Sequence, residues 1–132
     1  MSLHLTVVTP ERKVVETDAE EVQLPGSEGY LGILPGHAPL ITLLKTGVLS
    51  YRGGGRSGAL AVSAGFAEIA DDKVSVLADS AEGPSEIDAA AARNERSRAE
   101  EEMKTAGVDT LDAIRARFEL AEARLAVTQR PS

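Results

Sequence analysis

Cysteine and tryptophan are absent from this sequence of 132 residues, and aromatic residues make up only 3% of it. Without cysteine the chain has no disulfide, no thiolate nucleophile and no cysteine-based zinc site, which fits a reducing compartment. With so few aromatics, the core must be built from aliphatic side chains. Hydrophobic residues make up 42% of the chain, so we expect one compact domain with an appendage, or two very small domains.

Long apolar runs and a surplus of positive charge are also missing. No stretch approaches the roughly eighteen apolar residues that a membrane-spanning helix needs, so we expect no direct insertion into a membrane. The opening MSLHLTVVTPERK lacks the basic segment and long apolar run of a signal peptide. A formal net charge of −7 argues against nucleic-acid partners and against unaided binding to an anionic membrane. These absences indicate a cytosolic protein or a part of something larger.

The first 84 residues have the pattern of short β-strands. Apolar and polar residues alternate in LHLTVV (3–8) and KVSVL (73–77), a period that places one strand face on a core and the other in water. Strands that recur about every ten residues, with no helix pattern between them, predict an antiparallel sandwich or barrel. Similar runs, separated by turn formers, are EEVQL, PLITLL, GVLSY, ALAVS and FAEIA.

The remaining residues have the pattern of two helices. Ser85 is a candidate N-cap, with Asp88 three residues later completing a capping-box arrangement, and Gly107 stops the first helix. A second helix ends at about Gln129. The short connection at Gly107 predicts an antiparallel hairpin.

Together these patterns predict an α+β fold class. We expect an N-terminal antiparallel β-sandwich over residues 1–84, followed by a C-terminal antiparallel two-helix hairpin over residues 85–132. In the second helix, one apolar stripe is formed by Leu111, Ile114, Phe118, Ala121 and Leu125.

The first helix has few bulky side chains. Its only large apolar residues are Ile87 and Met103, so we expect the rest of its buried face to consist of Ala89 to Ala92 and Ala99, together with the stems of arginines. Burying alanine stabilises little, at about 25 cal/mol per Å² removed from water. Ordering the chain costs on the order of 1 kcal/mol per residue, so the hairpin is marginal by itself. We expect a hairpin that is held by a partner, rests lightly on the sandwich or switches between the two. A hairpin packed permanently on the sheet is the alternative.

Motifs that carry chemistry are weak. GGGRSG (53–58) matches a dinucleotide fingerprint, but a strand follows it where the fingerprint needs a helix, so we expect a hairpin loop. His4 and His37 lie in different elements without carboxylates at ligand spacing, which predicts no metal site. No serine lies in a nucleophile elbow between a strand and a helix. We therefore expect a protein without an active site of its own.

Five segments resemble the epsilon subunit of bacterial F-type ATP synthase. GILPGHAPL is the most specific part of this likeness, which covers nearly the whole chain. The resemblance implies a non-catalytic subunit of the central stalk, which couples rotation of the gamma subunit and the c ring to ATP synthesis. The segments are LTVVTPERKVV (5–15), VQLPGSEGYLGILPGHAPLIT (22–42), GVLSYR (47–52), SAGFAEIADDKVSVLAD (63–79) and EARLAV (122–127).

The resemblance also implies partners and a location. The sandwich would bind the gamma subunit and the c-subunit ring. The hairpin would be permissive when folded on the sandwich, and would block ATP hydrolysis when extended among the catalytic beta and alpha subunits. The implied location is peripheral, at the cytoplasmic face of the bacterial plasma membrane.

On the same resemblance, Glu28, Tyr30 and His37 are expected to contact the c ring. Pro35 and Pro39 would stiffen the backbone there, so that little entropy is lost on docking. His37 as a hydrogen-bonding residue within its own turn is an equal alternative. The neighbouring Leu31, Ile33 and Leu34 are expected to belong to the core.

Some members of the family bind ATP at the start of the hairpin. Ile87 and Asp88 fit the motif there, but Ala91 stands where the family has an arginine, and Leu120 replaces another. Because guanidinium groups form the charge-assisted bonds that recognise nucleotide, we expect weak or absent ATP binding and no cofactor. The residues that still fit the nucleotide site are Glu82, Ile87, Asp88, Arg98 and Arg124.

Arginines make part of the second helix basic. In the extended state they are expected to meet acidic helices of the catalytic subunits. The alternative is that they pair with Glu119 and Glu122 along an exposed helix and contribute little. The arginines concerned are Arg115, Arg117, Arg124 and Arg130.

Two other functions stay open from the residues. One is a free-standing binding module that uses the sandwich for a different ligand. The other is a small hydrolase or nucleotide-binding enzyme whose active site is assembled from scattered residues. Co-purification with a gamma subunit would distinguish a stalk subunit from the first, and turnover that survives rigorous purification would favour the second.

Overall fold

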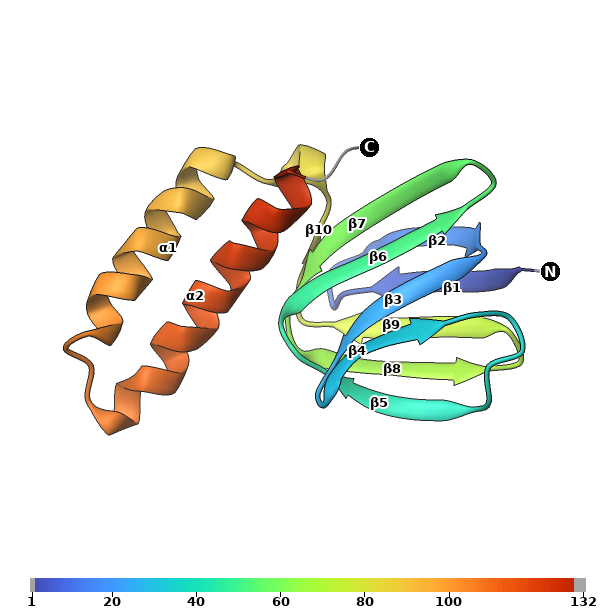
Figure 1. Ribbon diagram of the computed structural model, residues 1–132, viewed down its shortest axis with the longest axis horizontal. Coiled ribbons are helices and arrows are strands. Elements are labelled where there is room, and N and C mark those ends of the chain that lie inside the picture. Colours follow the sequence, from blue (N-terminus) through green and yellow to red (C-terminus); the bar gives the residue numbers. More distant parts are fainter. Residues whose placement is uncertain (1, 130–132) are drawn as a thin grey trace.

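A computed structural model describes residues 2–129, and it consists of a β-sandwich with a helical hairpin beside it (Figure 1). The strands are β1 (Leu3–Val8), β2 (Lys13–Ala19), β3 (Glu21–Gly26), β4 (Gly29–Ile33), β5 (Leu40–Leu44), β6 (Gly47–Gly53), β7 (Arg56–Val62), β8 (Gly65–Ala70), β9 (Lys73–Ala78) and β10 (Ala81–Glu82). A short 3₁₀ turn, η1 (Pro84–Glu86), leads to the helices α1 (Ala89–Met103) and α2 (Val108–Gln129). The α+β class predicted from the sequence is confirmed.

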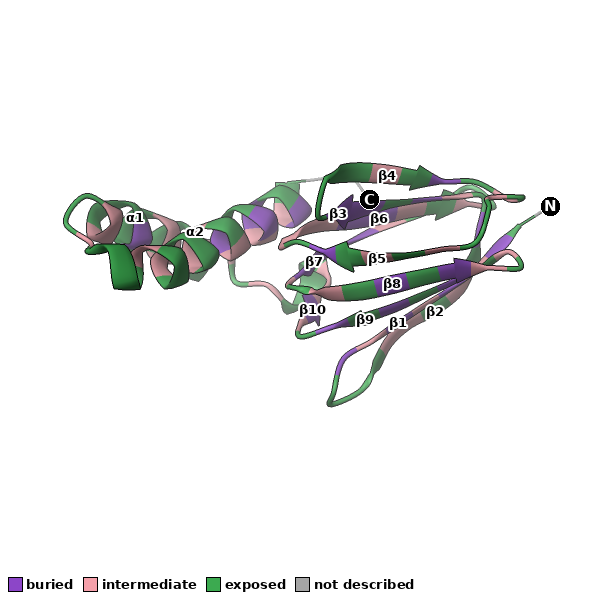
Figure 2. Ribbon diagram, turned by 90° about the horizontal axis from the view of Figure 1, so that it is seen from below, coloured by how far each residue is buried: buried purple, intermediate pink, exposed green. Residues whose placement is uncertain are grey.

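The strands are linked in the order β10-β7-β6-β3-β5-β8-β9-β1-β2, and β4 pairs with β3. Folding of this sheet onto itself gives two layers, with β3, β4, β6 and β7 in one and β5, β8, β9, β1 and β2 in the other (Figure 2). All pairs are antiparallel except β1 with β9, where His4 lies opposite Lys73. The expectation of an antiparallel sandwich is therefore corrected at this pair. No hairpin joins β1 to β9, so no turn forces them to run in opposite directions.

The core between the layers is aliphatic, as the composition predicted. On β1 the residues Leu3, Leu5 and Val7 are completely buried and the residues between them are not, which is the predicted alternation. Strands β2 and β4 lie in segments where the pattern did not predict them. Polar residues interrupt the apolar run of β2, and Gly29 and Gly32 interrupt that of β4, so neither segment has a clear strand pattern. The loop expected at GGGRSG is the β6–β7 hairpin turn, with Gly54 and Gly55 at positive φ.

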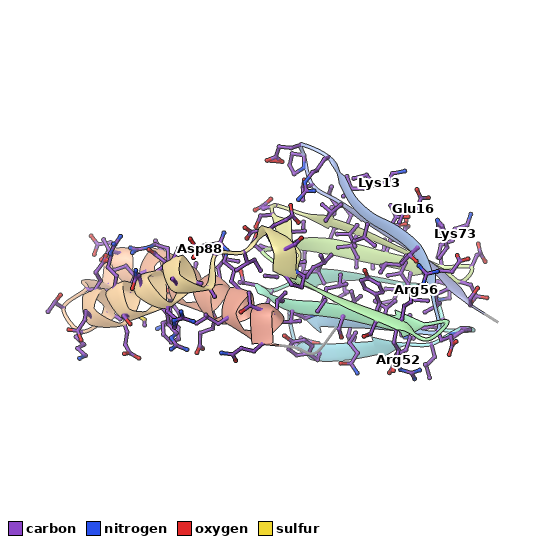
Figure 3. All side chains as sticks on the ribbon, turned by 90° about the horizontal axis from the view of Figure 1, so that it is seen from above. Lys13, Glu16, Arg52, Arg56, Lys73 and Asp88 are labelled. Atoms are coloured by element: carbon purple, nitrogen blue, oxygen red, sulfur yellow. The ribbon has the colours of Figure 1, made fainter. Side chains whose placement is uncertain are left out.

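The first helix begins later than the sequence pattern predicted. Asp88 is its N-cap, because Asp88 Oδ1 accepts the Ala91 N–H at 3.1 Å. Ser85 instead lies inside η1, where Glu86 accepts the Gly83 N–H at 3.0 Å. The predicted cap at Ser85 is wrong because Pro84 begins a separate turn that ends before the helix starts. Asp88 lies where the chain enters α1 (Figure 3).

The hairpin rests on the sandwich through α2. Ala123 and Val127 pack against Ala59 and Ala61 on the outer face of β7. Buried residues of α2 are concentrated in its C-terminal half (Figure 2). Helix α1 packs on α2 and buries only Ala92 and Ala99. The broader alanine face expected for α1 is corrected, because Ala90 and Ala91 are exposed.

Neither helix of the part that the structure describes is long and apolar enough to cross a membrane.

Candidate functional site

The residues expected at the c ring lie at the two ends of β4. Glu28 is exposed in the β3–β4 turn, and Tyr30 near the start of β4 is 61% exposed. The Tyr30 hydroxyl accepts the Val48 N–H at 3.0 Å, so its ring is fixed across the start of β6. His37 follows the other end of β4, in the connection to β5. The structure thus brings Glu28 and Tyr30 together but separates them from His37.

His37 makes its hydrogen bonds within its own turn. Its N–H donates to Leu34 O at 3.1 Å, and its ring Nδ1 donates to Ala38 O at 2.7 Å. Of its apolar neighbours, Ile33 is buried and Leu31 packs on the core, as expected. Leu34 is 53% exposed, so its assignment to the core is wrong. It follows the last residue of β4 and no longer alternates with the strand.

An exposed apolar row crosses the layer that faces away from α2. Leu43 on β5 lies directly opposite Phe66 on β8, and Phe66 lies opposite Leu77 on β9. Val8 on β1 continues the row beside Leu77. Leu43 is 66% exposed and Phe66 is 44% exposed. The sequence analysis did not predict this row. The segment PLITLL does carry apolar residues on both faces of its strand, but only the pairing register of the four strands shows that the exposed ones lie side by side.

Most residues of the expected nucleotide site line one cavity of about 440 Å³ between the hairpin and β10. Glu82, Ile87, Asp88 and Arg124 are among its lining residues, and so are the two replacements Ala91 and Leu120. Arg98 is the exception, because it lies outside this cavity on the exposed side of α1, 3.8 Å from Glu95.

Both arginines in the cavity are engaged by carboxylates. Arg124 Nε donates to Glu82 Oε1 at 2.7 Å, which ties α2 to β10. Arg117 donates to Glu95 at 2.6 Å and to both oxygens of Glu102 at 3.0 Å, which ties α2 to α1. The bonds from Arg117 lower the pKa of Glu102 below its ordinary value, and the bonds to Glu102 and Glu95 raise the pKa of Arg117. Four carboxylates and two guanidinium groups line the cavity, and one of the carboxylates, Glu86, is paired with Arg12 from outside it; the four are Glu82, Glu86, Asp88 and Glu95.

The arginines of α2 therefore do not form one exposed basic stripe. Arg117 and Arg124 point into the hairpin and the sandwich junction, whereas Arg115 lies near Asp112 at 3.5 Å. Their partners also differ from the expected Glu119 and Glu122. Glu122 lies instead 3.9 Å from Arg96 of the other helix. Arg130 lies outside the described residues.

His4 is held between two carboxylates on the outer face of β1. Its Nδ1 lies 3.0 Å from Asp18 Oδ1 and its Nε2 lies 2.9 Å from Glu16 Oε2, so the protonated ring donates a hydrogen bond to each carboxylate. The hydrogen bonds that the ring donates to Asp18 first, and then to Glu16, raise the pKa of His4. Lys13 lies 2.7 Å from Glu16, and Lys13, Glu16 and Lys73 project from this side of the sandwich (Figure 3). Within residues 2–129, no group of three or more histidine, aspartate or glutamate side chains is placed to hold a metal ion.

Two family models match the chain. Residues 2–84 match the model of the ATP synthase delta/epsilon chain, beta-sandwich domain, and residues 85–127 match that of the long alpha-helix domain of the same chain. An ATP synthase epsilon chain of Solibacter usitatus is 47% identical over 131 residues, which cover 98% of this chain and 97% of the relative. One of Koribacter versatilis is 52% identical over 101 residues, covering 76% of this chain and 71% of the relative.

Solved structures have the same fold. A chain of the Euglena gracilis mitochondrial ATP synthase, solved as OSCP/F1/c-ring, aligns with a TM-score of 0.83 at 21% identity, covering 95% of this chain and 80% of that one. A chain of the Tetrahymena thermophila mitochondrial ATP synthase, solved as central stalk/c ring, aligns with a TM-score of 0.63 at 15% identity, covering 98% of each. These two structures show only that the fold is shared, whereas the family models and the curated relatives also show the family. This chain belongs to the ATP synthase epsilon chain family, whose members are accessory subunits without an active site.

Proposed function

We propose that this chain works in the central stalk of a proton-translocating ATP synthase. It couples rotation of the gamma subunit and the c ring to ATP synthesis in the catalytic head, as a peripheral subunit at the cytoplasmic face of the bacterial plasma membrane. Membership of the epsilon chain family supports this, together with the central-stalk and c-ring assemblies in which chains of the same fold occur.

The apolar row on β5, β8, β9 and β1 is the observation that carries this proposal. Leu43, Phe66, Leu77 and Val8 form a continuous strip on a strand face that is left uncovered by the hairpin. Contiguous exposed apolar surface of this kind marks a protein interface. We assign it to the gamma subunit.

Substitution of Phe66 tests this assignment. Phe66→Ser removes the central side chain of the row and should weaken gamma binding about ten-fold or more, since aromatic anchors dominate interfaces. Val108→Ser is the matched control, because Val108 is 93% exposed at the distant tip of the hairpin. Co-purification and titration of gamma against the two variants measure the difference. Equal affinity of the two variants for gamma would contradict the assignment.

Glu28, Tyr30 and His37 are proposed to contact the c ring. Tyr30 presents an apolar ring whose hydroxyl is already hydrogen-bonded, and His37 lies in a loop that contains Pro35 and Pro39. Glu28 and Tyr30 lie at one end of β4 and His37 lies beyond the other end, so they contact the c ring at two separate places rather than as one patch.

The hairpin is proposed to inhibit ATP hydrolysis when it extends among the catalytic alpha and beta subunits. Its contact with the sandwich consists largely of alanine and valine, so docking is weak enough to be reversed. Extension would free Arg124 from Glu82, and separation of the two helices would free Arg117 from Glu95 and Glu102, for acidic helices of the head. Removal of residues 85–132 should leave gamma binding intact and raise ATP hydrolysis by the assembled enzyme. Loss of gamma binding in that truncation would exclude the regulatory role.

ATP is proposed to bind the hairpin weakly or not at all. Two arginines of the family site are replaced by Ala91 and Leu120, and Arg124 is already bonded to Glu82. The excess of carboxylates around the cavity also repels phosphate groups.

A gain-of-function variant tests this reasoning. The double variant Ala91→Arg with Leu120→Arg restores two guanidinium groups to the cavity and should bind ATP measurably more tightly than the wild type. Ala90→Arg with Ala113→Arg adds the same charge at exposed positions outside the cavity and serves as the control. Isothermal titration of both variants and the wild type decides the point. Micromolar affinity of the wild-type chain would refute the proposal.

A further inference from the structure

The turn between β8 and β9 contains a residue that its geometry does not favour. Ala70 pairs with Lys73, so Asp71 and Asp72 form a two-residue loop, and both have positive φ, at 52° and 60°. A two-residue turn with positive φ at both positions favours asparagine or aspartate first and glycine second. Asp71 thus fits its position, whereas Asp72 stands where glycine is favoured.

The side chain of Asp72 has a partner far away in the sequence. Its Oδ1 accepts the N–H of Gly36 at 2.7 Å. Its carbonyl oxygen also accepts the N–H of His4 at 2.8 Å, which anchors the turn to β1. Asp71 makes no side-chain hydrogen bond among the described residues. The two adjacent aspartates therefore share a backbone conformation but differ in what their side chains hold.

Gly36 belongs to the connection between β4 and β5, residues 34–39, which contains His37. This connection and the β8–β9 turn lie at the same end of the sandwich (Figure 1). The other hydrogen bonds of the β4–β5 connection are internal, from His37 to Leu34 and to Ala38. Among the hydrogen bonds of residues 2–129, the bond from Gly36 to Asp72 alone ties this connection to another segment.

We propose that Asp72 is a positioning residue for the c-ring contact. Its carboxylate holds the backbone of residues 34–39, and with it His37, in the conformation that docks, at the expense of an unfavourable position in the turn. The inference rests on the proposed contact between His37 and the c ring. A loop held in its bound shape before docking loses less entropy when it docks.

Three single variants of the full-length chain separate this role from simple turn stability. Asp72→Gly relieves the backbone but removes the acceptor. Asp72→Asn keeps an acceptor oxygen and tolerates positive φ. Asp71→Gly makes the same backbone change one residue earlier and leaves the bond to Gly36 in place.

Amide hydrogen exchange and thermal unfolding of these variants give the first readout. In Asp72→Gly, exchange of the Gly36 amide should rise about ten-fold or more, as expected for losing one hydrogen bond to a charged acceptor, while the melting temperature stays the same or rises. Asp72→Asn and Asp71→Gly should keep wild-type exchange at Gly36. Unchanged exchange in Asp72→Gly, or an equal rise in Asp71→Gly, would overturn the inference.

ATP-driven proton pumping by membranes reconstituted with each variant gives the second readout. Asp72→Gly should lower the pumping achieved per ATP hydrolysed, with rescue by Asp72→Asn. If the Gly36 amide is released but pumping is unchanged, Asp72 still positions the loop and the proposed His37 contact is what fails. If neither changes, Asp72 has no positioning role.

Discussion

The sandwich and the hairpin are stabilised in different ways. The sandwich encloses completely buried leucine, isoleucine and valine, such as Leu5, Leu24 and Ile33. The hairpin contacts it through small residues, Ala59 and Ala61 against Ala123 and Val127, and through the bond from Arg124 to Glu82. A region with a large aliphatic core has one stable conformation. A region held by alanines and ion pairs at the surface can leave its place without unfolding the rest.

A substitution in the aliphatic core should have the largest effect on stability. Ile69→Ala removes a side chain that is 1% exposed and should lower the free energy of unfolding by about 2–5 kcal/mol. Ile41→Ala, on the neighbouring strand but facing solvent, should change it by less than about 0.5 kcal/mol. Urea denaturation measures both. Similar losses in the two variants would mean that the sandwich does not depend on this core.

Overpacking under α2 should release the hairpin and leave the sandwich folded. Ala61→Leu inserts a bulky side chain between β7 and α2, where Ala61 is completely buried. Exchange of the α1 and α2 amides should accelerate strongly, while that of β1 and β9 stays slow. Ala116→Leu on the exposed side of α2 is the matched control. Cooperative loss of both regions in Ala61→Leu would show that they are one stability unit.

Removal of Arg117 should loosen the hairpin by a smaller amount. Arg117→Ala breaks the bonds to Glu95 and Glu102 that join α1 to α2, so amide exchange in α1 should accelerate severalfold. Because Arg117 lowers the pKa of Glu102, its contribution is present above the ordinary glutamate value of 4.5 and is lost as pH falls. Arg115→Ala, which removes only a contact within α2, should have little effect. An equal effect of the two variants at neutral pH would contradict the interhelical role.

The smallest effect should come from titration of His4. Its folded-state pKa lies above the ordinary value of 6.5, so the contribution of His4 to stability is complete below about pH 6.5 and is lost as pH rises through the folded value. His4→Gln should therefore be less stable than the wild type at pH 5.5 and nearly equal to it at pH 9. Thermal unfolding at the two pH values tests this, and a difference that grows toward pH 9 would have the wrong sign.

The sequence predicted local features better than features that depend on distant residues. Alternation in Leu3–Val8 predicted both the strand and its buried face. The parallel pairing of β1 with β9 could not be predicted this way, because it depends on where two separated strands meet. The helix start was missed because Ser85 and Asp88 both have capping oxygens, and the separate turn at Pro84 decides between them.

The candidate sites divide along the same line. Glu82 and Arg124 were grouped through the family resemblance, since 42 residues separate them and no periodicity relates them. The row from Leu43 to Val8 and the bond from Asp72 to Gly36 needed strand register and loop geometry. Contacts between residues far apart in the sequence leave no periodic pattern in it, so they can be identified only from the assembled sheet.

Amide hydrogen exchange of the free, full-length chain tests the central claim most directly. If the hairpin is only weakly docked, the amides of α1 and α2 exchange far faster than those buried in β1, β8 and β9, and deleting the hairpin leaves the strand rates unchanged. Equal protection of helices and strands in the absence of partners would contradict a hairpin that can move.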